Sequence, residues 1–132
     1  MKNVSTLLQE AQQEVEFIMI KPGFIHLTPI LLNIITNAGL RPIAWATKTL
    51  NYTEAQKFYE PHKDEDFYED LCTYMMSGPS TGIKCLNTNE VDVSKLKDSI
   101  REKYGEDEMR NVMHSSDSPK RRTIESNIYL KK

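Results

Sequence analysis

The chain has 132 residues and a mass of 15.3 kDa, which is the size of one domain. Hydrophobic residues make up 39% and charged residues 27%, so the composition excludes a chain that is disordered throughout. The formal net charge of −2 excludes a protein whose main role is to coat nucleic acid, and the longest apolar runs are far too short to span a bilayer.

Cysteine usage indicates the compartment. Cys72 and Cys85 form no CxxC pair and have no pair of histidines nearby, so the sequence predicts neither a zinc site nor a disulfide framework. Such usage is typical of a reducing compartment. Residues 1–5 lack the apolar core of a signal peptide. We therefore expect a cytoplasmic protein with no membrane segment.

The polar start of the chain differs from the rest. Residues 1–13 lack Gly and Pro, and they place Leu7, Leu8 and Ala11 at helical spacing. We expect a short helix here, in an extension over residues 1–14 that could dock a protein partner. A single domain would then cover residues 15–132.

The first predicted elements of that domain are a strand and a helix. The run from Val15 to Ile20 is rich in β-formers and is stopped by Lys21-Pro22-Gly23, which predicts a buried strand that ends in a turn. Thr28-Pro29 is typical of an N-cap followed by proline at the first helical position. Gly39 would close that helix.

Further elements follow in chain order. Ile43 to Leu50 predicts a second strand, Thr53-Glu54-Ala55-Gln56 matches a capping box, and Phe67, Leu71 and Tyr74 share one helical face. Ser80 to Leu86 predicts a third strand. Val93, Leu96 and Ile100 define a further helix that ends near Gly105. Asn111 to His114 predicts a short last strand, and a helix follows from Pro119 with Ile124 and Ile128 turned inward.

The order of these elements predicts the fold class. Strands and helices interleave within one short chain, which favours one sheet with helices packed on it. We expect an α/β (α+β) domain of the ferredoxin-like, split βαββαβ type, with a four-stranded antiparallel sheet.

His114 is the most informative candidate for chemistry. It ends a predicted strand and precedes a small polar turn into the last helix, where Glu125 lies two turns further on. A carboxylate that holds one ring nitrogen leaves the other free to act as a nucleophile. The alternative interpretation is an ordinary surface histidine in a serine-rich turn.

Other candidates each have a simple structural alternative. Lys21 ends the first strand at an edge that binds ligands in many sheets, or it is a solvated strand end. Arg101 and Arg110 lie among acidic residues, so surface ion pairs would explain them. Tyr59 and Phe67 could sandwich a flat ring, or they could belong to the core.

Together these segments match a known family. Over about residues 15–130 the sequence resembles the nucleoside diphosphate kinase family. The strongest match is Asn111 to Ser118, because the family signature reads Asn-x-x-His-Gly-Ser-Asp-Ser. The other matching segments are Phe17 to Pro22, Gly39-Leu40, Phe58-Tyr59, Tyr74 to Pro79, and Ser99 to Arg101 with Tyr104-Gly105.

The resemblance implies a ping-pong transfer of the γ-phosphate of ATP or another nucleoside triphosphate to a nucleoside diphosphate. By motif, His114 would be the nucleophile, Glu125 would hold its other nitrogen, and Lys21 and Tyr59 would lie beside the transferred phosphate. Arg101 would bind nucleotide phosphates, Asn111 the sugar region, and Phe67 the base. The cofactor would be Mg²⁺ carried by the nucleotide phosphates, with no metal ligand from the protein.

The sequence departs from the family in three places. Lys21-Pro22 is followed by Gly23-Phe24 where the family has Asp-Gly, and Ser115 stands where it has Gly. The stretch between Pro79 and Arg101 is markedly shorter, so two phosphate ligands of the family are not identified here. Lys84, Lys95 and Lys97 are candidate replacements, although a lysine lacks the paired donors of arginine.

The same stretch commonly takes part in subunit contacts, so we expect a dimer-based homo-oligomer rather than the usual hexamer. Three functions remain open on sequence alone: an active kinase, an interaction module such as those in ciliary or flagellar assemblies, and a nucleotide-binding regulator.

Overall fold

The structure is a computed structural model that describes residues 15–130, so the helix expected within residues 1–13 lies outside the described residues. One antiparallel sheet has the strand order β2-β3-β1-β4. Its strands are β1 (Val15–Ile20), β2 (Arg41–Lys48), β3 (Ser80–Leu86) and β4 (Met113–Ser115). The helices are α2 (Thr28–Asn37), α3 (Tyr52–Phe58), α4 (Tyr68–Met75), α5 (Val93–Tyr104) and α6 (Pro119–Leu130), with short 3₁₀ turns η1 (Ile25–Leu27) and η2 (Glu60–His62).

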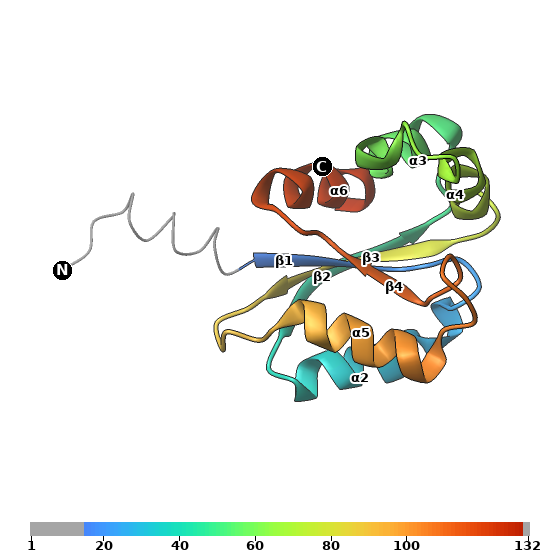
Figure 1. The fold of residues 1–132 in the computed structure, drawn as a ribbon. Helices are drawn as coiled ribbons and strands as arrows, with labels where there is room; N and C mark the ends of the chain where they lie inside the picture. Colours follow the sequence, from blue (N-terminus) through green and yellow to red (C-terminus); the bar gives the residue numbers. More distant parts are fainter. Residues whose placement is uncertain (1–14, 131–132) are drawn as a thin grey trace, which may run out of the picture.

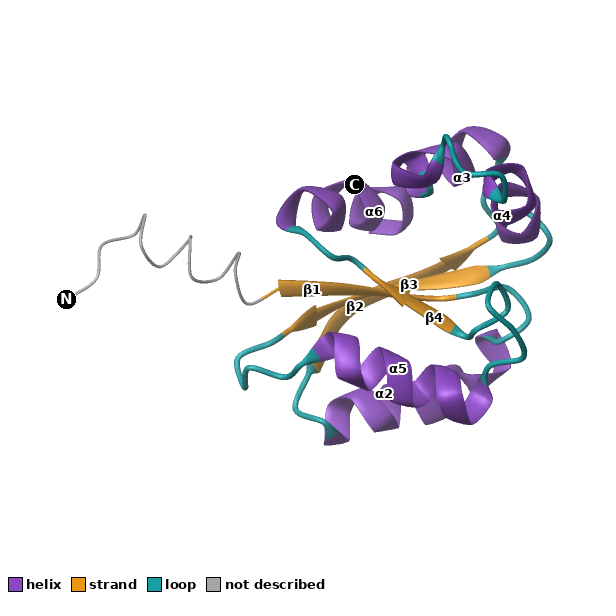
Figure 2. Cartoon of the chain, in the orientation of Figure 1, coloured by secondary structure: helices purple, strands orange, loops and turns teal. Residues whose placement is uncertain are grey.

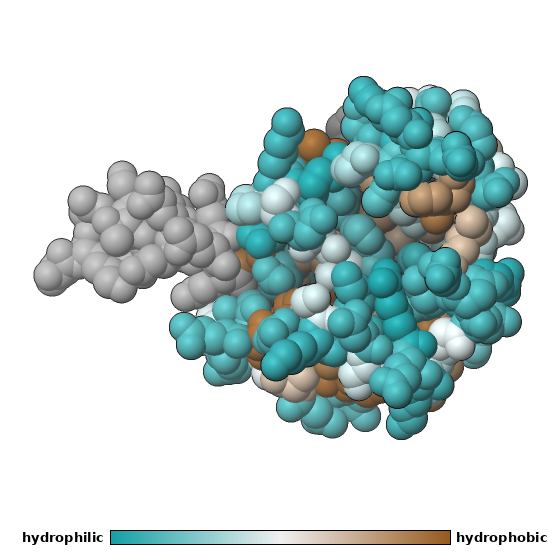
Figure 3. Space-filling view, in the orientation of Figure 1, coloured by the Kyte–Doolittle hydropathy of each residue, from teal (hydrophilic) through white to brown (hydrophobic). Residues whose placement is uncertain are grey.

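Helices cover both faces of the sheet, and the predicted ferredoxin-like βαββαβ fold is confirmed. Figure 1 and Figure 2 show α2 and α5 on one face and α3, α4 and α6 on the other. Within residues 15–130, no helix is both long and apolar enough to cross a membrane. The face seen in Figure 3 is mostly hydrophilic, and its hydrophobic residues form separate small patches.

The sheet separates two hydrophobic cores, and β1 contributes to both. Ile18 and Ile20 point into the core beneath α2 and α5, whereas Phe17 and Met19 point into the core beneath α3, α4 and α6. A central strand buried on both faces reads as a continuous apolar run rather than an alternating one. This explains why the sequence from Phe17 to Ile20 is apolar at every position.

Two helix starts differ from the sequence prediction. Leu27 occupies the N-cap position of α2 without a capping side-chain hydrogen bond, and the Thr28 hydroxyl instead donates a hydrogen bond back to the Ile25 carbonyl in the preceding turn. The capping box begins at Asn51 instead of Thr53: the Asn51 side chain accepts from the Glu54 N–H at 2.9 Å, and Glu54 accepts from the Asn51 N–H at 3.0 Å. Asparagine is as good an N-cap as serine or threonine, and Glu54 stands three residues after it.

The buried face of α6 also differs from the prediction. Ile124 and Ile128 are only half-buried, whereas Glu125 and Tyr129 are 2% and 6% exposed. The polar atoms of these two buried side chains have hydrogen-bond partners. The Tyr129 hydroxyl lies 2.6 Å from Ser80 Oγ, and each oxygen of the Glu125 carboxylate takes part in a hydrogen bond. The helix is therefore oriented by two polar groups, which a hydrophobic pattern does not detect.

We predict that Gly82→Ala destabilises the domain by about 1–3 kcal/mol, because the added methyl group overpacks the core. A Cβ at residue 82 would lie 2.5 Å from Tyr129 Cγ and 2.8 Å from Phe17 Cζ. Urea unfolding measures the change. Gly78→Ala is the matched control, because its nearest neighbour would be Pro22 at 3.9 Å. Equal stability of the two variants would contradict the packing seen at Gly82.

Candidate active site

His114 lies in the short strand β4, opposite Met19 of β1. Its ring packs edge-on against Phe58, with ring centroids 4.9 Å apart. The side chain is 24% exposed, so it is held by packing and is still reachable from solvent. The alternative of an ordinary surface histidine does not describe this environment.

Glu125 is the partner of His114, as the sequence predicts. Glu125 Oε1 lies 2.7 Å from His114 Nε2 and accepts a hydrogen bond from Ser116 Oγ at 2.7 Å. Its other oxygen, Oε2, accepts from Arg121 Nε at 3.1 Å. The carboxylate is nearly inaccessible to solvent, and these three side chains fix its orientation.

Burial and hydrogen bonding together set the protonation of this pair. Burial alone would raise the pKa of Glu125, but the hydrogen bonds from His114 and Ser116 and the charge of Arg121 outweigh it and hold that pKa below its ordinary value. Burial lowers the pKa of His114 despite the nearby carboxylate. The result is a neutral imidazole whose Nε2–H donates to Glu125, which leaves the lone pair of Nδ1 free.

Lys21 is buried rather than solvated, so the simple alternative for this residue is wrong. It is 4% exposed, and its Nζ donates to Asn111 Oδ1 at 2.6 Å and to the Met109 carbonyl at 3.2 Å. Burial lowers its pKa to about 7, with further lowering from the charges of Arg101 and Lys97. An anion bound beside Lys21 would favour the protonated, positively charged form of its amine.

Two cations on α5 face the same region. Arg101 donates from Nε to the Met113 carbonyl at 3.1 Å, and burial lowers its pKa. Lys97 is half-buried one helical turn earlier, and its charge acts on both Lys21 and His114. Of the three lysines named as replacement phosphate ligands, Lys97 is therefore the one near the histidine.

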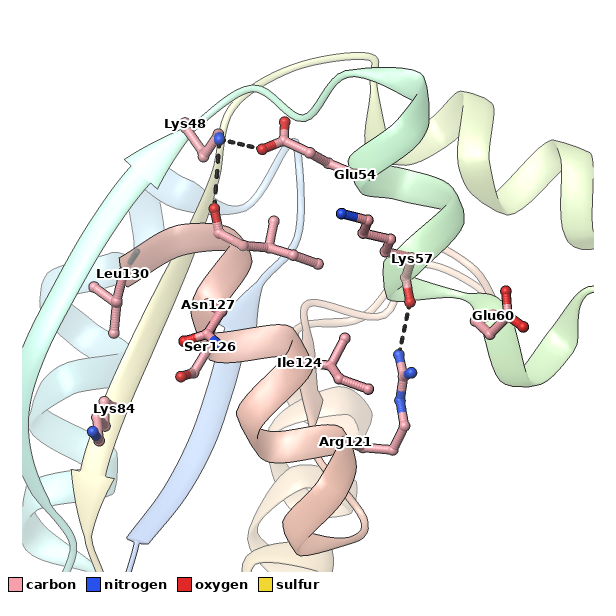
Figure 4. A pocket seen from close by; sticks show the side chains of 11 residues that line it. Lys48, Glu54, Lys57, Glu60, Lys84, Arg121, Ile124, Ser126, Asn127 and Leu130 are labelled. Atoms are coloured by element: carbon pink, nitrogen blue, oxygen red, sulfur yellow. Dashed lines mark hydrogen bonds and ion pairs between the residues drawn. The ribbon is translucent and has the colours of Figure 1, made fainter. Parts of the chain in front are cut away.

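Other candidates from the sequence lie elsewhere. Lys84 lines a groove of about 930 Å³ together with Lys48 and Leu130. Figure 4 shows these side chains on the side of α6 where Arg121 also lies. Lys95 is exposed on α5. Arg110 pairs with Glu106 at 3.1 Å, which confirms the surface ion pair expected for it.

Tyr59 and Phe67 differ in their surroundings. Tyr59 is 5% exposed, burial raises the pKa of its hydroxyl, and that hydroxyl has no hydrogen-bond partner among the described residues. Phe67 is 44% exposed at the start of α4, and its ring lies 5.8 Å from that of His62, which lies 6.3 Å from Tyr59. Phe67 is thus an accessible ring at the outer end of an aromatic row and is not part of the core.

Val112 has an unusual backbone conformation directly before β4. Its φ is +80°, a value that β-branched residues rarely adopt, and its side chain is fully buried. Its carbonyl accepts from the Lys21 N–H at 2.7 Å, which joins the start of β4 to the end of β1. The sequence gives no sign of this strain, which lies two residues from His114.

Sequence reasoning also missed Ser116 and Arg121, both of which bind Glu125. The i, i+4 spacing of Arg121 and Glu125 on one helix was a usable signal for that pair. For metal binding, residues 15–130 contain no group of three or more His, Cys, Asp or Glu side chains that could hold an ion.

Comparison with known proteins identifies the family. The family model described as nucleoside diphosphate kinase matches residues 14–132. A nucleoside diphosphate kinase from Ignicoccus hospitalis is 30% identical over 131 residues, with 89% of each chain covered.

Solved structures show the same fold. A nucleoside diphosphate kinase from Encephalitozoon cuniculi superposes with a TM-score of 0.81 at 23% identity, covering 90% of each chain. One from Halobacterium salinarum, in complex with CDP, superposes with a TM-score of 0.76 at 19% identity, covering 90% of this chain and 88% of that one. The family match spans nearly the whole chain and includes the His114 site, so the chain belongs to the nucleoside diphosphate kinase family.

Proposed function

We propose that this chain is an active nucleoside diphosphate kinase that transfers phosphate through His114. The observation that carries the proposal is the contact between His114 Nε2 and the buried Glu125 carboxylate, which leaves Nδ1 as a free nucleophile. An interaction module or a passive nucleotide-binding regulator has no need of this pair. The catalytic domain would cover residues 15–132, with residues 1–14 as an extension.

The chemistry has two half-reactions. The Nδ1 lone pair attacks the γ-phosphorus of a nucleoside triphosphate such as ATP, and the bond from that phosphorus to its bridging oxygen breaks. The electron pair leaves with the nucleoside diphosphate. A terminal oxygen of a second nucleoside diphosphate then attacks the phosphorus, and the P–N bond breaks. Glu125 stabilises the positive charge that the ring acquires while it carries the phosphoryl group.

Cations around His114 would neutralise the transferred group. We assign Lys21, Arg101 and Lys97 to the nucleotide phosphates, since their charges converge on this region. The unpartnered Tyr59 hydroxyl supplies a donor for a phosphate oxygen. Positioning and charge neutralisation account for most of the catalysis in phosphoryl transfer.

We assign the remaining nucleotide contacts to Asn111 and Phe67. Asn111 would lie at the sugar while its Oδ1 holds Lys21. Phe67 would stack on the base, because its ring is exposed beside His62. Magnesium bound to the nucleotide phosphates would supply further charge neutralisation. Activity in the cytoplasm fits the two free cysteines, Cys72 and Cys85.

We predict that incubation with γ-labelled ATP and magnesium places an acid-labile, base-stable phosphate on His114, and that the label moves to an added nucleoside diphosphate. His114→Ala should abolish both steps, because among residues 15–130 His114 is the histidine whose ring is held by a buried carboxylate. His26→Ala is the matched control, since His26 is exposed and away from Glu125. Labelling that survives in His114→Ala would refute the assignment of the nucleophile.

We predict that the rate of self-phosphorylation stays constant as pH is lowered through about 6.5, the ordinary histidine value. The pKa of His114 is depressed by burial, so the nucleophilic neutral ring persists below that pH and is lost only in more acidic solution. Quenched-flow measurement of the first half-reaction from pH 5 to pH 8 tests this. A rate that already halves near pH 7 would contradict it.

We also propose that the protein is a dimer formed along β2. Among residues 15–130, β2 is an edge strand, and it exposes the large side chains Ile43 (44%) and Trp45 (54%). An exposed hydrophobic edge is typical of an interaction surface. Trp45→Lys should shift the protein toward monomer in sedimentation velocity, while Met76→Lys, at the C-cap of α4, should not. A wild-type monomer at high protein concentration would exclude this interface.

A further inference from the structure

We infer that Arg121 is a positioning residue for phosphoryl transfer, one that fixes both the orientation and the charge state of the Glu125 carboxylate. The inference rests on the proposed function, because it concerns how His114 is prepared as a nucleophile. Arg121 itself lies behind Glu125 and is not proposed to touch nucleotide.

The Arg121 guanidinium makes three hydrogen bonds at once. Its Nε donates to Glu125 Oε2 at 3.1 Å, and its Nη2 donates to the carbonyls of Lys57 at 2.9 Å and Phe58 at 2.8 Å. The side chain is 12% exposed. Figure 4 shows Arg121 reaching from α6 to the backbone of α3.

The two carbonyls belong to the last turn of α3, where a carbonyl lacks the N–H partner four residues on that it would have inside a helix; the Lys57 carbonyl also accepts from the Tyr59 N–H. A cation at this end also interacts favourably with the helix dipole. Phe58 is the ring that packs on His114, and Tyr59 follows it. Arg121 therefore ties the carboxylate that binds His114 to the segment that packs against His114.

The carboxylate itself shows what Arg121 contributes. Oε1 is occupied by His114 and Ser116, and Oε2 is occupied by Arg121. Without Arg121, Oε2 would be a buried acceptor lacking its partner, and the carboxylate could rotate away from the geometry that holds Nε2–H. Lysine cannot make this set of contacts, because a single ammonium lacks the planar fork of a guanidinium.

The charge of Arg121 has a second effect on the pair. A positive charge beside the carboxylate disfavours uptake of a proton by the buried pair of His114 and Glu125. The other charged or titratable groups that face the pair are Lys21 after β1, Lys97 on α5, Tyr59 after α3, and Tyr129 on α6. These four groups stay the same when Arg121 is replaced, so a shift in the titration of the His114 ring reports on the loss of Arg121.

The test compares Arg121→Met and Arg121→Lys with Lys120→Met, which removes an exposed charge from the adjacent position on α6. One readout is the rate of self-phosphorylation by ATP against pH, together with the KM for ATP. The second is titration of the His114 ring by NMR, which needs no activity. If the wild type does not label, the proposed function fails, while the ring titration still tests the role of Arg121.

Arg121→Met should slow phosphorylation about 10- to 100-fold with little change in KM, a loss typical of misplaced reacting groups. In this variant, the acidic limb of the pH–rate profile and the midpoint of the His114 ring titration should both move to higher pH. Arg121→Lys should restore the position of the acid limb, because the charge returns, and only part of the rate. Lys120→Met should match wild type.

Two results would overturn the inference. One is Arg121→Met with wild-type rate and titration. The other is a variant that melts at lower temperature yet keeps both pH curves in place, since that is the behaviour of a purely structural residue. If Arg121→Met does not fold, Arg121→Gln takes its place in the comparison.

Discussion

The site depends on one buried carboxylate. Glu125 lies almost wholly out of water, and an ionised carboxylate there is stable because three side chains donate hydrogen bonds to it. Those donors are the His114 ring, the Ser116 hydroxyl and the Arg121 guanidinium, which come from a strand, a turn and a helix. The same contacts that satisfy the charge also orient the imidazole. One set of hydrogen bonds therefore both holds α6 on the sheet and leaves His114 Nδ1 free to act as a nucleophile.

Much of the fold was predictable because its main elements obey local rules. The run from Phe17 to Ile20 predicted a buried strand, and the structure adds only that both of its faces are covered. The helix carrying Val93 and Ile100 agreed with its hydrophobic spacing and ended before Gly105. Element boundaries were less predictable, as Asn51 shows, because several polar residues close together can each cap a helix.

The site was predictable only where the chain order brings its members together. His114 lies in β4 and Glu125 lies two turns into α6, so the chain order allowed their contact, and the match to the family signature predicted it. The burial of Lys21 did not, because it depends on Asn111 and its neighbours, which are about ninety residues away in sequence. The positive φ of Val112 has no local signal either, since valine disfavours it and only the surrounding packing can maintain it.

Identification of the phosphorylated nitrogen tests the account most directly. Uniformly ¹⁵N-labelled protein is phosphorylated with ATP and magnesium, and long-range ¹H–¹⁵N correlations with phosphorus coupling are recorded on the His114 ring. The contact between Nε2 and Glu125 predicts phosphate on Nδ1 with a retained proton on Nε2. Phosphate on Nε2 would contradict the account, because that nitrogen would have to leave the carboxylate on which the site is built.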